Sequence, residues 1–86
     1  MAIANRNDST FATRNTALAA YLRIRGIKLL DVEPTLDNIP AVFLFENNSE
    51  IAEYERLWQL GKAEGNLTFF WESYRLCLRM IRVGKL

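Results

Sequence analysis

Hydrophobic and polar positions follow two different periods along this chain, and these periods predict helices toward both ends with strands between them. Apolar residues three and four positions apart predict a helix over residues 9–25, capped by Ser9 or Thr10 and ended by Gly26. Two bases in its last turn favour the same end, because cations stabilise a helix C-terminus. The apolar face of this helix would hold Phe11, Leu18, Tyr21 and Leu22.

Two strands should follow this helix. β-branched and partly alternating residues predict a strand over 27–33, and the apolar run 41–46 predicts a second. The segment 34–40 between them contains two prolines and an Asp-Asn pair, so the strands should form an antiparallel hairpin. The second strand is apolar on both faces and should be covered on both. A second copy of the protein is a candidate for one of these covers.

Two further helices are expected toward the C-terminus. Asn47, Asn48 or Ser49 would cap the first, whose buried stripe would hold Ile51, Tyr54, Leu57, Trp58 and Leu60. After a break between Gly61 and Gly65, Asn66 or Thr68 would start the last helix. Its apolar positions are Leu67, Phe70, Trp71, Tyr74, Cys77, Leu78 and Ile81.

The predicted element order is α-β-β-α-α, and the fold class is α+β. With 86 residues, the chain has room for one small domain. We expect a flexible N-terminal tail over residues 1–8 and a single domain over 9–86, with the antiparallel hairpin packed on the helices. A domain of this size buries only about 60–65% of the surface of its unfolded chain, so self-association would add useful stability.

Residue types that commonly carry catalysis are scarce. The chain has no histidine and one cysteine, Cys77, which falls at a core position of the last helix. Glu46, Glu50 and Glu53 are spaced by four and three residues, as at a solvated helix start, and no second acidic motif joins them into a metal site. We therefore expect no enzyme, no cofactor and no small-molecule substrate.

Basic residues concentrate at the C-terminus although the formal net charge is only +1. Arg75, Arg79 and Arg82 step by four and three residues along one helical face, and Lys85 continues it. Such a face could neutralise backbone phosphates of a nucleic acid, with help from Arg23, Arg25 and Lys28 if the fold brings them to the same side. The simpler interpretation is a solvated helix surface.

The aromatic cluster in the last helix has two interpretations. Phe70, Trp71 and Tyr74 can share the core face and pack against Trp58 and Tyr54, while Phe69 lies about a quarter-turn away. The alternative is a protein-binding surface, because exposed Trp and Tyr dominate interfaces. The candidate interface residues are Phe69, Trp71, Val42 and Leu44.

Taken together, these residues form a pattern that resembles a family of small bacterial and phage domains of unknown function. The matching residues are Phe11 and Thr13, Leu18-Ala19-Ala20-Tyr21-Leu22, Gly26, Leu29, Phe43-Leu44-Phe45-Glu46, Leu60-Gly61-Lys62, Phe69, Leu76 and Leu78. The resemblance spans residues 11–81 and concerns packing positions. This chain departs from the pattern at Asn15, where an acidic residue is expected, and in its bulky run Phe69-Phe70-Trp71. The resemblance implies a bacterial, viral or mobile-element setting and carries no active site.

The chain contains no apolar run of the ~20 residues that a membrane span requires. Its N-terminus lacks a signal-peptide pattern, so a cytoplasmic location is expected. We expect a non-catalytic protein–protein interaction or assembly module that binds a protein partner and self-associates as a homodimer. The alternative is a small nucleic-acid-binding accessory protein that uses the basic C-terminal helix.

Overall fold

The computed structural model describes residues 10–33 and 41–83, the last two by backbone alone. These residues form three helices and a three-stranded antiparallel sheet, so the predicted α+β class is confirmed. The elements in chain order are β1 (Thr10–Thr13), α1 (Thr16–Ile24), β2 (Leu29–Glu33), β3 (Val42–Glu46), α2 (Ile51–Gln59) and α3 (Leu67–Val83). The predicted tail over 1–8 and the turn over 34–40 lie outside the described residues.

The predicted start of the first helix was wrong, because residues 10–13 form strand β1. This strand pairs antiparallel with β3, placing Phe11 opposite Phe45 and Thr13 opposite Phe43. The helix begins later, at a cap formed by Asn15, whose Oδ1 accepts a hydrogen bond from the N–H of Leu18 at 3.0 Å. The hydroxyl of Thr13 accepts a hydrogen bond from the N–H of Asn15 at 3.1 Å, which links the end of β1 to the capping residue of α1.

The predicted end of this helix at Gly26 is confirmed. Gly26 has φ +90°, a conformation that glycine adopts without the steric cost of a Cβ. Its N–H donates to the carbonyl of Arg23, and the N–H of Ile27 donates to the carbonyl of Leu22, each at 3.1 Å. This pair of hydrogen bonds is the Schellman motif, which satisfies carbonyls that the helix leaves unpaired.

The predicted antiparallel hairpin is confirmed as β2 and β3, and β1 adds a third strand on the other side of β3. The strand order β1-β3-β2 therefore puts β3 in the middle of the sheet. Phe43 and Phe45 of this strand are fully buried in the core with residues of the helices, which accounts for one apolar face of β3. A register shift between Leu29 and Asp31 leaves Leu30 at a bulge in the edge strand β2.

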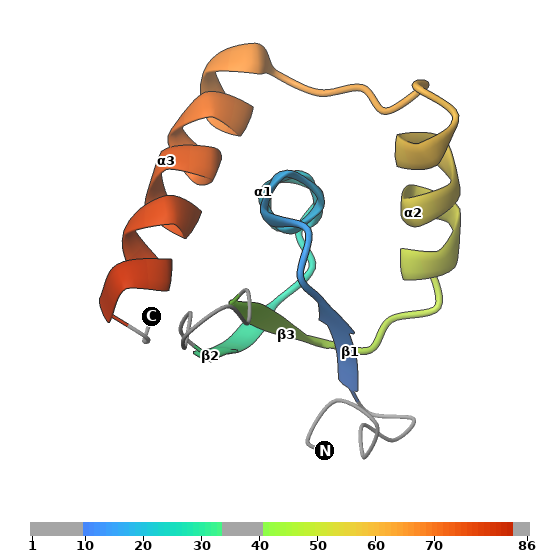
Figure 1. Cartoon of the computed structure of the whole chain (residues 1–86). Helices are drawn as coiled ribbons and strands as arrows, with labels where there is room; N and C mark the ends of the chain where they lie inside the picture. The colour runs from blue at the N-terminus through green and yellow to red at the C-terminus, as the bar shows by residue number, and fades with distance from the viewer. Residues whose placement is uncertain (1–9, 34–40, 84–86) are drawn as a thin grey trace.

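Helix α1 is the centre of the molecule. Viewed along its axis, it has α3 and α2 on either side, the sheet beneath it and the α2–α3 connection above it (Figure 1). Residues 18–22 are five consecutive buried positions, which at 100° per residue reach every side of the helix. The prediction of one apolar face was thus too narrow: a helix that is apolar all round is a buried helix.

Helix α3 begins where predicted. Oδ1 of Asn66 accepts a hydrogen bond from the N–H of Phe69 at 2.9 Å, so Asn66 caps this helix. Within the described part of the chain, no helix is both long enough and apolar enough to cross a membrane.

Candidate functional site

The exposed large apolar side chains of the described residues gather on α3. Outside this helix, only Leu30 and Leu60 belong to the set, so the predicted burial of Leu60 was wrong. The members on α3 are Leu67, Phe69, Trp71, Leu76 and Leu78. They divide into two groups on opposite flanks, because residues two apart on a helix point roughly 200° away from one another. Phe69 and Trp71 therefore cannot belong to one contiguous surface.

The first flank, which we name the Trp71 face, is a series of large apolar residues separated by four, three, four and three positions. Its members are Leu67, Trp71, Tyr74, Leu78 and Ile81. Leu67 is 83% exposed and Trp71 57%, whereas Tyr74 and Ile81 are half-buried. Of the two interpretations of the aromatic cluster, core packing is therefore wrong for Trp71. The 4-3-4-3 spacing is the one by which two helices pack along each other.

The Trp71 face continues into the interior through a series of aromatic rings. The Trp71 ring stacks on the Tyr74 ring with 6.1 Å between their centroids, and the Tyr74 ring stacks on that of Phe70 with 6.2 Å between centroids. The Phe70 ring packs against the ring of Trp58 in α2, and the Trp58 ring packs against that of Tyr21 with 5.6 Å between centroids. The predicted core packing of Phe70 and Tyr74 is confirmed. Trp71 is thus the solvent-exposed end of a packed aromatic series and is held by it.

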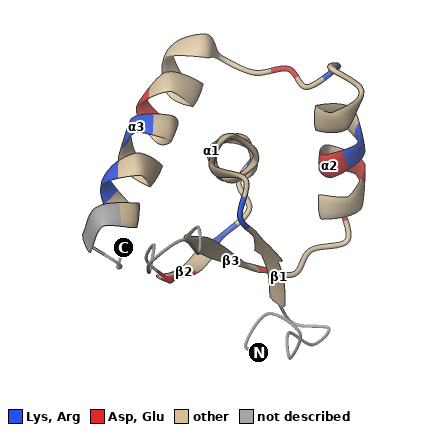
Figure 2. Cartoon of the chain, in the orientation of Figure 1, with Lys and Arg blue, Asp and Glu red and all other residues tan. Residues whose placement is uncertain are grey.

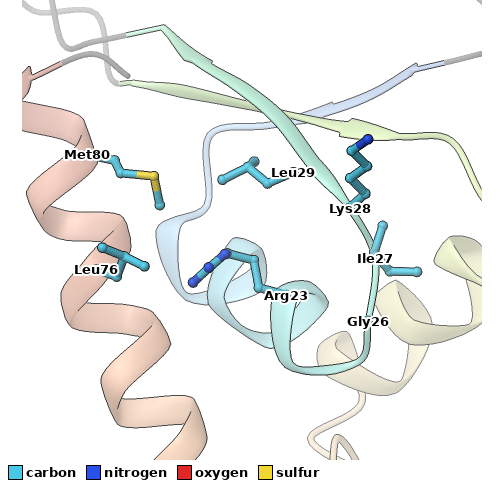
Figure 3. A pocket seen from close by; sticks show the side chains of 7 residues that line it. All are labelled: Arg23, Gly26, Ile27, Lys28, Leu29, Leu76 and Met80. Atoms are coloured by element: carbon cyan, nitrogen blue, oxygen red, sulfur yellow. The ribbon is translucent and has the colours of Figure 1, made fainter. Parts of the chain in front are cut away.

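The second flank of α3 lines a groove against α1 and β2, which we name the Arg23 groove. One depression of about 370 Å³ is lined by Arg23, Gly26, Ile27, Lys28, Leu29, Leu76 and Met80. An adjoining depression of about 290 Å³ shares Arg23 and Leu76 and adds Ile24, Phe69, Glu72 and Ser73. Figure 3 shows that the side chains of Arg23, Leu29, Leu76 and Met80 point toward one another.

Polar contacts fix the floor of this groove. Nη1 of Arg23 donates to Oγ of Ser73 at 3.0 Å, and that hydroxyl donates to the carbonyl of Ala20 at 3.1 Å. Cys77 lies beside them and is fully buried, as its core position predicted. Burial raises the pKa of the Cys77 thiol, and the nearby Arg23 charge and hydrogen bonds with Arg23 and Ser73 offset only part of this rise.

The predicted basic surface is not assembled in one place. Arg75 and Arg79 are exposed, and at 100° per residue they project from the side of α3 opposite the buried Ser73 and Cys77. The other basic residues of the described part lie on several different elements (Figure 2). Arg23 points instead into the groove, and the guanidinium of Arg25 lies over the Tyr54 ring at 5.3 Å on the side of α2. The side chain of Arg82 and all of Lys85 lie outside the described part of the structure.

The two predicted interface residues on β3 lie in the sheet. Val42 is 2% exposed and Leu44 is half-buried. Neither contributes a large exposed apolar side chain.

The acidic residues do not form a metal site within the described part of the chain. Their side chains, with cysteine included, form no group of three or more that could hold a metal ion. Glu53 forms an exposed ion pair with Arg56 at 2.7 Å, and this hydrogen bond lowers the pKa of the Glu53 carboxyl. The carboxylate is therefore engaged within α2 itself.

Comparison with known proteins identifies the family. A family model covers residues 8–56, more than half of the chain, and is described as Domain of unknown function (DUF5659). The chain belongs to this family. The resemblance noted in its sequence is thereby confirmed over β1, α1, β2, β3 and the first part of α2. No curated protein and no solved structure matches the chain.

Within the DUF5659 segment, three residues set the start and the end of α1. Thr13 accepts the N–H of Asn15, Asn15 caps α1 and Gly26 ends it. The aspartate or glutamate that the resemblance implies at position 15 is replaced here by asparagine, and asparagine caps a helix as aspartate does. Helix α3, with the Trp71 face and one wall of the Arg23 groove, lies beyond the matched residues.

Proposed function

We propose that this protein is a non-catalytic protein–protein interaction module that self-associates through the Trp71 face of α3. The observation that carries the proposal is the exposure of Leu67, Trp71 and Leu78 at helix-packing spacing on a helix whose other side is already anchored to α1. Monomeric proteins seldom leave such a contiguous apolar series in water.

The spacing supports a two-fold symmetric pairing of two α3 helices. If the helices run antiparallel about Tyr74, Leu67 of each copy lies opposite Ile81 of the other. Trp71, three residues before Tyr74, then lies beside Leu78, four residues after it in the other copy, so a large side chain meets a smaller one on both sides of the axis. A closed two-fold interface uses the same patch on both subunits, and this face is self-complementary in that sense.

The energetics favour the same use of the face. Burial of a large apolar side chain contributes about 1.5–3 kcal/mol. Trp71 is held by Tyr74 before any partner arrives, so its ordering costs little on association. A rigid, partly exposed tryptophan at the middle of a patch is the kind of residue that dominates binding energy.

The setting we propose is the cytoplasm of a bacterial, phage or mobile-element system. The family resemblance and the unpaired thiol of Cys77 support this setting, since free thiols persist in reducing compartments. The module would act there by assembly, either with itself or with a protein partner.

Nucleic-acid binding is the second candidate function, and Arg75 and Arg79 support it. Both are exposed on the outer side of α3, off the Trp71 face, and form no ion pair within the described residues. Two arginines would give a weak, salt-dependent affinity for phosphates. Arg23 and Arg25 point to other parts of the molecule and add little to this surface.

Sedimentation equilibrium on two variants tests the proposal. The substitutions Trp71→Glu and Leu78→Glu should each convert a dimer into a monomer, because each puts a charge at the centre of the pairing. The matched control is Leu60→Glu, which changes an exposed leucine at the C-cap of α2 and should leave the dimer intact. Equal dimerisation in all three variants would contradict the proposal.

A further inference from the structure

Arg23 is a half-buried cation that has no carboxylate partner among the described residues. Its polar partners within the described residues are the hydroxyl of Ser73 and the thiol of Cys77, both neutral groups. Within the described part of the chain, Glu53 and Arg56 form an ion pair on the exposed side of α2, and Arg23 takes no part in it. A guanidinium has five N–H donors, so Arg23 retains donors for a ligand in the groove.

The walls around this guanidinium are apolar. Leu29 comes from β2, whereas Leu76 and Met80 come from α3, and their side chains converge with that of Arg23 in Figure 3. The adjoining depression extends the groove between α1 and α3, where Ile24 and Phe69 line it. The Phe69 side chain is 62% exposed. A cavity of a few hundred Å³ with apolar walls and one convergent charge is the usual construction of a small-ligand site.

We propose that the Arg23 groove binds a carboxylate that carries an apolar group. The carboxylate would accept hydrogen bonds from the Arg23 guanidinium, and the apolar group would lie against Leu29, Leu76 and Met80. The planar fork of arginine matches the two oxygens of a carboxylate, and the resulting charge-assisted hydrogen bonds are strong in a partly dry site.

Charge in the groove selects a singly charged anion. Lys28 also lines the groove, but its ammonium group extends away from Arg23, Leu76 and Met80 in Figure 3, so Arg23 is the cation beside these apolar side chains. Glu72 lies along the adjoining depression and opposes a second negative charge there. A phosphate ester with two charges therefore fits less well than a carboxylate.

Two sources would supply this chemistry: a free fatty or aryl acid, and the C-terminal residue of a polypeptide that ends in an apolar side chain. The site does not depend on the self-association proposed above. Leu76 and Leu78 lie on opposite flanks of α3, so the Trp71 face can be blocked while the groove stays open.

Methyl and arginine-side-chain NMR on the full chain tests the proposal. The probes are octanoate, N-acetyl-leucine and the uncharged N-acetyl-leucinamide. Octanoate or N-acetyl-leucine should shift the Met80 and Leu76 methyl signals and the Arg23 Nε–H signal to saturation, and tighter binding of one of them identifies the source. The amide should bind more weakly than its acid by about tenfold or more. Absence of a saturable shift with both acids, or equal binding of the amide, overturns the proposal.

Variants locate the carboxylate. Arg23→Gln should abolish the shifts, while Arg25→Gln removes the same charge two residues away and should leave them unchanged. Because Arg23→Gln also removes a hydrogen bond to Ser73, Leu76→Asp provides a second test. Leu76 is 37% exposed, so this change is tolerated by the fold and puts a competing carboxylate beside Arg23. Octanoate binding by Leu76→Asp as strong as that of the unmodified chain would overturn the proposal.

Discussion

Arg23 and Ser73, fifty residues apart in the chain, are joined by a hydrogen bond of 3.0 Å from Nη1 to Oγ across the contact between α1 and α3. The Ser73 hydroxyl in turn donates a hydrogen bond to the carbonyl of Ala20 at 3.1 Å. The pair fixes the position of α3 against the central helix. It also directs Arg23 away from Arg75 and Arg79, which separates the predicted basic residues.

Substitution of Ser73 by alanine should therefore destabilise the fold. Ser73 is 6% exposed, and its removal leaves donors of Arg23 and the carbonyl of Ala20 without their buried partner. We expect a loss of about 1–2 kcal/mol in the free energy of unfolding, measured by urea denaturation. Thr68→Ala, an exposed change on the same helix, is the control. Equal stability of the two variants would mean that the bridge contributes nothing.

The cap at Asn15 gives a second prediction. Asn15→Ala should lower the free energy of unfolding by about 1 kcal/mol, because the N–H of Leu18 loses its side-chain acceptor. Asn15→Asp retains the acceptor and adds a charge that the helix N-terminus favours, so it should be at least as stable as the unmodified chain. Thermal denaturation of the two variants checks this order, and a reversed order would contradict the cap.

Gly26 and Gly65 are both glycines near α1, but they differ in what an added Cβ would meet. Gly26→Ala should cost about 1 kcal/mol, because φ +90° is strained for alanine although the space around it is open. At Gly65 the Cβ would lie 2.9 Å from Cδ1 of Ile24, the end of a side chain that can rotate. Gly65→Ala should therefore cost less. A larger loss at Gly65 in urea denaturation would show that Ile24 cannot move.

The raised pKa of Cys77 predicts a pH dependence of stability. Because the thiol ionises at a lower pH in the unfolded chain than in the folded one, deprotonation favours unfolding. The free energy of unfolding should fall as the pH rises above about 8.5, the ordinary pKa of a cysteine. The difference between the unmodified chain and Cys77→Ala should show this component. A difference that stays constant across this range would contradict the burial effect.

Much of the fold could be predicted from local sequence. The Schellman end at Gly26, the cap at Asn66 and the β2–β3 hairpin follow from short-range rules. Strand β1 could not be predicted in this way. Its four residues continue the helical spacing of the residues after them, and they become a strand because they pair with β3, between 30 residues (Thr13–Phe43) and 36 residues (Thr10–Glu46) later in the chain.

The site was harder to predict because it depends on which side of each helix is already covered. Periodicity grouped Trp71 with Phe70 and Tyr74, yet α1 and α2 cover only the latter two, and Trp71 is left at the surface. The same limit applied to Arg23, whose direction is set by Ser73 of a distant helix. Sequence spacing predicts the face of a helix on which a side chain lies, but tertiary packing determines whether that face is buried or exposed.

Light scattering coupled to size exclusion tests the central claim, self-association through the Trp71 face, most directly. The full chain should elute at about 20 kDa, twice its mass of 10.0 kDa, at both low and high salt. A short mixed-sequence DNA should leave this mass unchanged, and Trp71→Glu should reduce it to that of the monomer. A 10.0 kDa species at all protein concentrations, or one that shifts with DNA only at low salt, would contradict the claim.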